Sequence, residues 1–310
     1  MRPINFHAVI AATPTPFTTD LAVDEPALRR YMRWVADRGV AAVAVNADSG
    51  EGSSLSRDER RRIIEVVAEE IGDGTGIVAG IVASYTAQAV ELARDAAAAG
   101  ADALLVFPLA AYLGEPLPPE LPYHYHAAIA DAVDLPLILF QMPKDLGGVF
   151  YSPDTLERLL GIESVAAMKE ASFDGQVFTQ TLQLVHSARP GVALMTGNDT
   201  FIRESFILGA DGALIGFGAI AGREVGDLLS AVRGRDYARA DAIAASIQPL
   251  AEAIYARPLR DARARLKHAL ALMGVLDVAA VRPPLLPLGE GEQHRVARAL
   301  EPLRTPAGRP

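Results

Sequence analysis

Cysteine is absent from this chain of 310 residues, and tryptophan occurs only once. The absence of cysteine excludes disulfides, thiolate catalysis and zinc–cysteine sites. The histidines do not form a metal site either, because His124 and His126 stand two positions apart in an expected helix and so face different directions. We therefore expect no metal site and no other cofactor.

Positive charge is also in the minority, with 29 Lys and Arg against 38 Asp and Glu and a net charge of −9. Such a chain offers no broad basic surface to nucleic acid or to an anionic membrane. No uninterrupted apolar run reaches membrane-spanning length, and the first residues lack the apolar core of a signal peptide. We expect a cytoplasmic protein with neither nucleic-acid nor membrane partners.

Eight short apolar runs alternate with longer amphipathic segments. The runs are residues 7–13, 40–45, 76–82, 103–107, 135–140, 164–169, 192–196 and 212–215. They are apolar almost throughout, as expected for parallel strands covered on both faces. Eight strand–helix units in sequence predict an α/β fold, a (β/α)8 TIM barrel. The alternative is a doubly wound open sheet, but no Gly-x-Gly-x-x-Gly follows the first run and no Walker loop is present.

The chain turns helical after the eighth run. Apolar periodicity predicts helices over residues 221–232, 236–255 and 259–273, and a short charged helix over 289–303. We expect two parts, a catalytic barrel over residues 1–220 and a C-terminal helical region over 221–310 packed on the barrel. The last six residues, 305–310, are expected to be disordered.

Lys169 stands at the end of the sixth run, and it is the only lysine directly at a strand end. Active sites of such barrels lie at the carboxyl ends of the strands. Burial disfavours the charged amine, and a neutral amine can attack a carbonyl to form a Schiff base. The alternative is a strand that surfaces in a solvated pair of Lys169 and Glu170.

Polar residues follow the second and seventh runs. Ser49 and Gly50 offer a hydroxyl and backbone N–H groups that suit a carboxylate, although an ordinary polar turn has the same composition. Asp48 is either a turn residue or an acid–base group. Asn198 precedes Asp199, which we interpret as the cap of the following helix.

Four segments together resemble the dihydrodipicolinate synthase and N-acetylneuraminate lyase family of class I aldolases. Residues 47–56 are similar to the family loop Gly-Thr/Ser-Thr-Gly-Glu-x-x-x-Leu-Thr/Ser, and 165–170 to the strand that ends in the Schiff-base lysine and a glutamate. Residues 196–199 resemble a Gly-Asp/Asn-Asp turn, and 209–213 a Gly-Ala-x-Gly segment. The likeness covers about residues 8–273.

The resemblance implies a (β/α)8 barrel with a C-terminal helical domain, commonly assembled as a homo-oligomer, a tetramer or dimer. It implies that Lys169 condenses with the keto group of pyruvate or another small-molecule 2-oxo acid, while Ser49 binds the carboxylate. The remaining expected substrate-binding residues adjoin these strand ends: Gly50, Phe140, Gln141, Asn198 and Ile215.

The sequence departs from the family pattern where a second substrate is handled. Phe140 replaces a tyrosine that relays protons, and phenylalanine cannot transfer a proton. Asp145 falls where synthases carry an arginine, and it would repel a carboxylate. We therefore do not expect a lysine-pathway synthase. Asp48 is our hypothesis for the replacement proton relay, with Tyr112 as second choice.

The sequence thus predicts a Schiff-base lyase that performs aldol cleavage or condensation, or dehydrates a 2-keto-3-deoxy acid. Both reactions share one enamine intermediate. The alternative is a catalytically impaired barrel that binds a small 2-oxo acid as a sensor. Turnover across a panel of 2-oxo acids distinguishes an enzyme from a sensor.

Overall fold

The computed structural model describes residues 2–304. Eight parallel strands form a closed barrel in chain order, β1 pairing with both β2 and β8. The strands are β1 Val9–Ala12, β2 Ala42–Val45, β3 Gly76–Ile81, β4 Ala103–Val106, β5 Leu137–Gln141, β6 Val165–Glu170, β7 Ala193–Thr196 and β8 Gly212–Ile215. All eight predicted strands and the barrel are confirmed, and closure between β1 and β8 rules out the open sheet.

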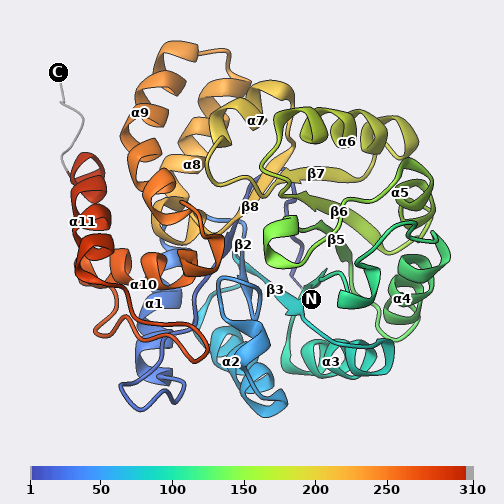
Figure 1. Ribbon diagram of the computed structural model, residues 1–310, viewed down its shortest axis with the longest axis horizontal. Helices are drawn as coiled ribbons and strands as arrows, with labels where there is room; N and C mark the ends of the chain where they lie inside the picture. The colour runs from blue at the N-terminus through green and yellow to red at the C-terminus, as the bar shows by residue number, and fades with distance from the viewer. Residues whose placement is uncertain (1, 305–310) are drawn as a thin grey trace.

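Eight helices surround the barrel, one after each strand (Figure 1). They are α1 Glu25–Ala36, α2 Arg57–Glu70, α3 Thr86–Ala99, α4 Glu120–Ala130, α5 Pro153–Leu160, α6 Gly175–Ala188, α7 Ile202–Leu208 and α8 Gly218–Arg233. Local signals fix several of their starts. Ser56 and Glu59 form a reciprocal capping box at α2, and Ser152 caps α5 immediately before its first proline.

Short 3-10 turns lie in four loops: η1 Gly52–Ser54, η2 Ala110–Tyr112, η3 Lys144–Leu146 and η4 Leu259–Asp261. η1, η2 and η3 follow β2, β4 and β5, so they lie at the carboxyl end of the barrel. η4 leads into α10 and contacts η3. The C-terminal region therefore reaches the same end of the barrel as the loops after the strands.

The C-terminal helices are α9 Tyr237–Ile254, α10 Ala262–Leu272 and α11 Glu290–Arg304, close to the predicted ranges. They gather on one side of the barrel beside α1 and α8 (Figure 1). α8 packs against β1 as the eighth barrel helix, so the barrel extends past the predicted boundary at residue 220. The predicted disorder of 305–310 lies outside the described residues. None of the helices within residues 2–304 combines the length and apolarity needed to cross a membrane.

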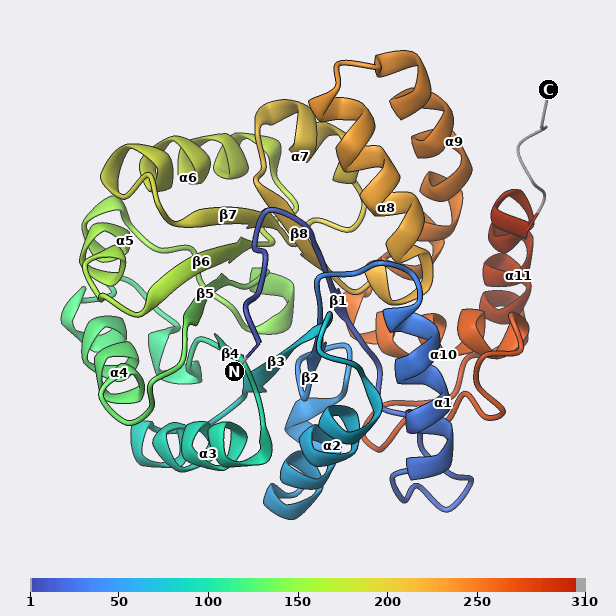
Figure 2. The same ribbon diagram turned by 180° about the vertical axis from the view of Figure 1, so that it is seen from behind.

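The strands are buried on both faces because one face fills the barrel and the other packs on the helices. The inner layer is rich in small side chains, including Ala42, Ala44 and Ala167. The segment before β1 crosses one end of the barrel (Figure 2), where Ile4 and Phe6 pack against the inner layer. Closing that end leaves the opposite end, at the carboxyl ends of the strands, for a site.

Candidate active site

A pocket opens at the carboxyl end of the barrel and encloses about 440 Å3 of empty space, open solvent included. Loops from β2, β5, β6, β7 and β8 line it, together with the segment between α9 and α10. The lining residues are Asp48, Ser49, Phe140, Pro143, Leu146, Lys169, Ala171, Phe173, Gly197, Asp199, Gly216, Tyr255, Leu259 and Ala262. The pocket therefore joins the barrel to the C-terminal helical region.

Lys169 projects into this pocket from β6, and its side chain is only 8% exposed. Its Nζ atom lies 4.4 Å from the centre of the Phe140 ring. Burial lowers the pKa of Lys169, and the negative charges of Asp199 and Asp48 partly oppose this shift. A Cβ atom on Gly197 would come within 2.7 Å of the Lys169 Cε atom, so glycine is needed there for the lysine to lie as it does. The lowered pKa increases the fraction of the amine that is neutral, and the neutral amine is the form that attacks a carbonyl.

Phe140 lies beside the lysine, where its ring packs edge-on against Phe107 with centroids 5.0 Å apart. The side chain is buried and has no group that can carry a proton. Lys169 therefore faces an apolar ring on the β5 side of the pocket.

The loop after β2 brings Ser49 into the lining. Within the described residues, neither the N–H of Ser49 nor that of Gly50 donates a hydrogen bond. The carbonyl of Gly50 accepts a hydrogen bond of 2.8 Å from the Thr15 hydroxyl, which holds the loop in place. Ser49 therefore brings an unused backbone N–H and a hydroxyl to the pocket, and both are suited to binding a carboxylate. Gly50 is buried and is not among the lining residues.

Asp48 lines the pocket as predicted, but its carboxylate forms a salt bridge with Arg263 of α10. The Arg263 Nε group also donates to the Asp48 carbonyl at 2.9 Å. The sequence did not point to Arg263, which lies far along the chain in a region with no recognisable motif. This pairing competes with a role for Asp48 in moving protons.

Asp199 does not cap α7, which begins after Phe201 without a side-chain cap. Its buried carboxylate instead accepts a hydrogen bond of 2.8 Å from the N–H of Phe217, in the loop after β8. Burial raises the pKa of Asp199 to about 7, against the opposing effects of that N–H, Lys169 and the Tyr255 hydroxyl. The interpretation of Asp199 as a helix cap was therefore wrong.

Tyr255 follows α9 directly, and sequence reasoning missed it. Its hydroxyl pairs with Asp199, and burial raises the pKa of that hydroxyl. No local pattern marked this tyrosine, whereas Asp199 stood at a strand end and could have been given a site role on that ground.

The side chains of Gln141, Asn198 and Ile215 lie outside the pocket, which corrects their expected contact with substrate. Gln141 and Asn198 both donate to Glu170, at 3.2 and 2.7 Å. Ile215 packs in the outer core layer. The reason is strand alternation: Gln141 follows the inward-facing Phe140, so it points to the opposite face.

Tyr112 lies away from the pocket, whereas Asp145 lies at its rim. Tyr112, the second choice for the relay, packs against Tyr125 and does not line the pocket. This corrects its expected place beside Lys169. Asp145 lies at the rim, where it forms a salt bridge of 2.7 Å with Arg257.

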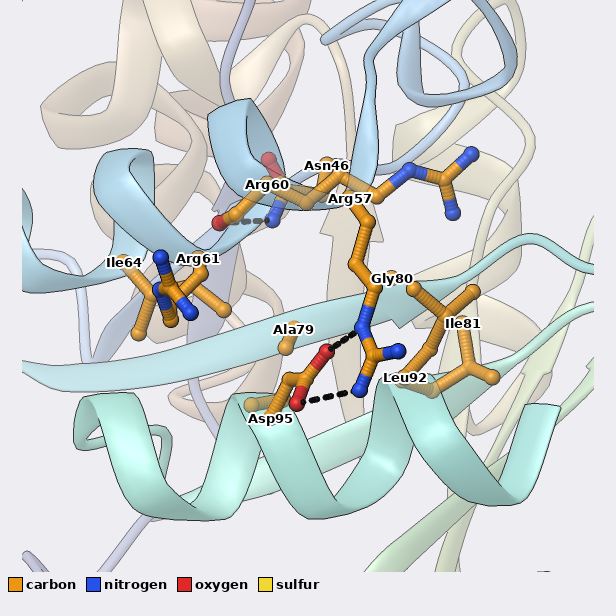
Figure 3. A pocket seen from close by; sticks show the side chains of 11 residues that line it. Asn46, Arg57, Arg60, Arg61, Ile64, Ala79, Gly80, Ile81, Leu92 and Asp95 are labelled. Atoms are coloured by element: carbon orange, nitrogen blue, oxygen red, sulfur yellow. Dashed lines mark hydrogen bonds and ion pairs between the residues drawn. The ribbon is translucent and has the colours of Figure 1, made fainter. Parts of the chain in front are cut away.

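A second hollow lies outside the barrel, between α2 and α3 over β3 (Figure 3). Arg57 and Asp95 form an ion pair across it, and Asn46 donates to the carbonyl of Arg60 at 2.9 Å (Figure 3). It contains no lysine and no other nucleophile, so we do not assign chemistry to it. No group of three or more His, Asp or Glu within residues 2–304 is arranged to hold a metal ion.

A closed (β/α)8 barrel with a buried lysine at the end of β6, lining one pocket with the loop after β2, is typical of Schiff-base-forming lyases. The chain belongs to the Dihydrodipicolinate synthetase family, whose model matches residues 5–303. The resemblance found in the sequence is confirmed, and the protein is a lyase of the class I aldolase type.

Relatives match over nearly their full length. The 4-hydroxy-tetrahydrodipicolinate synthase of Kineococcus radiotolerans is 33% identical, over 97% of this chain and 93% of the relative. The dihydrodipicolinate synthase of Acinetobacter baumannii, solved with pyruvate, is 29% identical, with a TM-score of 0.83 over 95% of this chain and 97% of that one. The Agrobacterium tumefaciens enzyme is 28% identical, with a TM-score of 0.85 and coverage of 96% and 98%.

Proposed function

We propose that this protein condenses Lys169 with pyruvate or another 2-oxo acid and makes or breaks a bond through the resulting enamine. The buried Lys169 at the end of β6 carries the proposal, because burial lowers its pKa and favours the nucleophilic amine. The pyruvate complex of the Acinetobacter baumannii relative supports the choice of ligand. Aldol cleavage and dehydration are both compatible with this intermediate.

The loop after β2 holds the carboxylate in this proposal. The N–H groups of Ser49 and Gly50 donate no hydrogen bond within residues 2–304, and Ser49 lines the pocket. Ser49 and Lys169 line the same pocket, so a 2-oxo acid held by the loop can present its keto carbon to the lysine. Backbone donors bind an anion without costing side-chain entropy.

The other end of the pocket supports an uncharged, apolar acceptor rather than the carboxylated aldehyde of lysine biosynthesis. Leu146, Phe173 and Leu259 are among the lining residues. Asp145 at the rim is paired with Arg257, and its negative charge disfavours a second carboxylate beside it. We infer that this protein is not a lysine-pathway synthase, although its relatives carry that name.

A turnover assay over a panel of 2-oxo acids tests the proposal. The panel contains aldol adducts of pyruvate with apolar aldehydes, 2-keto-3-deoxy sugar acids, and pyruvate with aspartate semialdehyde. We expect turnover with at least one of the first two groups. A kcat/KM above roughly 10⁴ M⁻¹s⁻¹ with aspartate semialdehyde contradicts the exclusion of the lysine pathway. Binding without turnover of any member supports a sensor instead.

A further inference from the structure

Chemistry at the imine requires a group that takes and returns a proton close to Lys169. Phe140 cannot do so, and the pocket lining holds few alternatives. Asp48 is committed to its salt bridge with Arg263. This leaves the pair formed by Asp199 and Tyr255.

The hydroxyl of Tyr255 lies near the Ser49 hydroxyl in the pocket lining. A Cβ atom on Gly216 would lie 1.9 Å from the Tyr255 hydroxyl oxygen and 2.8 Å from the Ser49 Oγ atom. Both hydroxyls therefore converge over Gly216, and Tyr255 lies beside the proposed carboxylate site. Tyr255 as a whole is half-buried, and it lines the pocket together with Ser49 and Asp199.

The Tyr255 hydroxyl is hydrogen-bonded to the Asp199 carboxylate, so the two groups can exchange a proton. The N–H of Phe217 fixes one carboxylate oxygen at 2.8 Å. The charge of Lys169 acts on the same carboxylate. No side chain within the described residues forms a salt bridge with Asp199, in contrast to Asp48.

We propose that Tyr255, with Asp199 behind it, is the proton relay that replaces the missing tyrosine of β5. The proposal rests on the proposed Schiff-base function and adds a catalytic residue to it. Tyr255 is assigned to contact the substrate, and Asp199 to hold the proton. The C-terminal region thereby contributes part of the catalytic apparatus.

The proton transfers balance for pyruvate. The C3–H bond of the iminium breaks, its electron pair forms the C2–C3 double bond, and the C–N π pair returns to nitrogen as the enamine lone pair. The proton passes to the Tyr255 oxygen as the phenolic proton passes to Asp199. Reversal returns a proton to C3. In aldol cleavage the C4 hydroxyl proton follows the same route while the C3–C4 bond breaks.

Exchange of the pyruvate methyl hydrogens for deuterium, followed by proton NMR in D2O, tests the relay without knowledge of the physiological substrate. We expect Tyr255→Phe to slow exchange by about 10²-fold or more while still forming the imine that borohydride traps. Asp199→Asn should also slow exchange and retain trapping. Tyr112→Phe is the matched control, because that tyrosine is buried outside the pocket, and it should exchange at the wild-type rate.

Two results would overturn the inference in distinguishable ways. Exchange at the wild-type rate in Tyr255→Phe, with trapping intact, removes Tyr255 as the relay and leaves the proposed function standing. A wild-type protein that traps no pyruvate and exchanges no hydrogen removes the proposed function, and the relay with it. Circular dichroism and thermal unfolding establish that each variant is folded.

Discussion

Asp48 and Arg263 form a salt bridge that ties the loop after β2 to the first turn of α10. The Arg263 Nε group also donates to the Asp48 carbonyl at 2.9 Å, so one side chain holds both the backbone and the carboxylate of this residue. The loop carries Ser49 and Gly50. The C-terminal helical region thus fixes the proposed carboxylate site as well as contributing Tyr255.

Arg263→Ala is expected to weaken substrate binding more than chemistry. Without the guanidinium, the loop that carries Ser49 and Gly50 is no longer held in place. Binding must then order the loop, and the lost conformational entropy weakens the affinity. We predict a KM for pyruvate in the exchange assay that rises by about tenfold, with a maximal rate within about threefold of wild type. Arg61→Ala, at an exposed arginine of α2, is the control and should change neither value.

Asp48→Asn tests whether the Asp48 carboxylate only holds its loop through Arg263 or also transfers the proton. The amide keeps the shape of the side chain and can still accept from Arg263, but it cannot carry a proton. We expect the exchange rate to fall less than about tenfold. A fall of about 10²-fold with trapping at Lys169 intact would return the relay to Asp48, in line with the hypothesis drawn from the sequence.

The pH dependence of exchange is expected to follow Asp199. Burial raises its pKa to about 7, and it accepts a proton only when ionised. Four ionisable groups face the site from different elements, Lys169, Tyr255, Asp48 and Arg263. Since the rate requires the Asp199 carboxylate, it should rise with pH through about 7. A flat profile from pH 5.5 to 8 contradicts this assignment.

The same pKa shift makes a prediction for stability. The folded protein keeps the Asp199 proton up to about pH 7, whereas an unfolded chain releases it near the ordinary value of 3.8. The stability that this proton contributes is therefore present at low pH and is lost as pH rises through the folded pKa. Asp199→Asn removes this loss, so its stability relative to wild type should increase by more than about 1 kcal/mol between pH 5 and pH 8. Urea unfolding at both pH values measures the difference.

Lys267 and Glu51 form a fully buried ion pair between α10 and the loop after β2. Lys267 also donates to the carbonyl of Ala280 at 2.7 Å. Lys267→Met leaves Glu51 buried without its cation, and we expect a loss of about 3–5 kcal/mol in the free energy of unfolding. Arg61→Met removes two exposed ion pairs, with Asp58 and Glu65, and should cost less than about 1 kcal/mol. Equal losses in the two variants would show that burial of the pair does not matter.

Gly197→Ala tests whether the lysine needs the space beside it. The added Cβ atom would lie 2.7 Å from the Lys169 Cε atom and 2.8 Å from the Ala171 Cβ atom. We expect imine formation to slow by about 10²-fold or more, because the amine is displaced from its position for attack. Gly226→Ala is the control, since nothing lies within 4 Å of its added carbon. Wild-type trapping rates in Gly197→Ala contradict the placement of Lys169.

The barrel and the lysine could be predicted because their signals are local. Eight apolar runs mark strands covered on both faces, and Lys169 ends one of them. Tyr255 and Arg263 could not be found in this way, because only the packing of α9 and α10 on the barrel brings Tyr255 to the pocket and Arg263 to Asp48. The residues next to them in the sequence are typical of an ordinary helix and loop and contain no motif.

Two errors have the same physical origin. Gln141 was expected at the substrate because it stands at a strand end beside Phe140, although successive strand residues face opposite sides of the sheet. Asp199 was interpreted as a helix cap from the residues that follow it, but a long-range hydrogen bond from the Phe217 N–H determines its position. Local patterns place a residue on an element without determining the direction of its side chain.

The identity of the lysine that captures a 2-oxo acid tests the central claim most directly. The protein is incubated with pyruvate, reduced with borohydride, digested and analysed by peptide mass spectrometry. We predict a single reduced adduct at Lys169, and none in Lys169→Arg, whose guanidinium stays protonated and cannot act as the amine. An adduct at Lys144 or Lys267, or no adduct with any 2-oxo acid, would contradict the assignment.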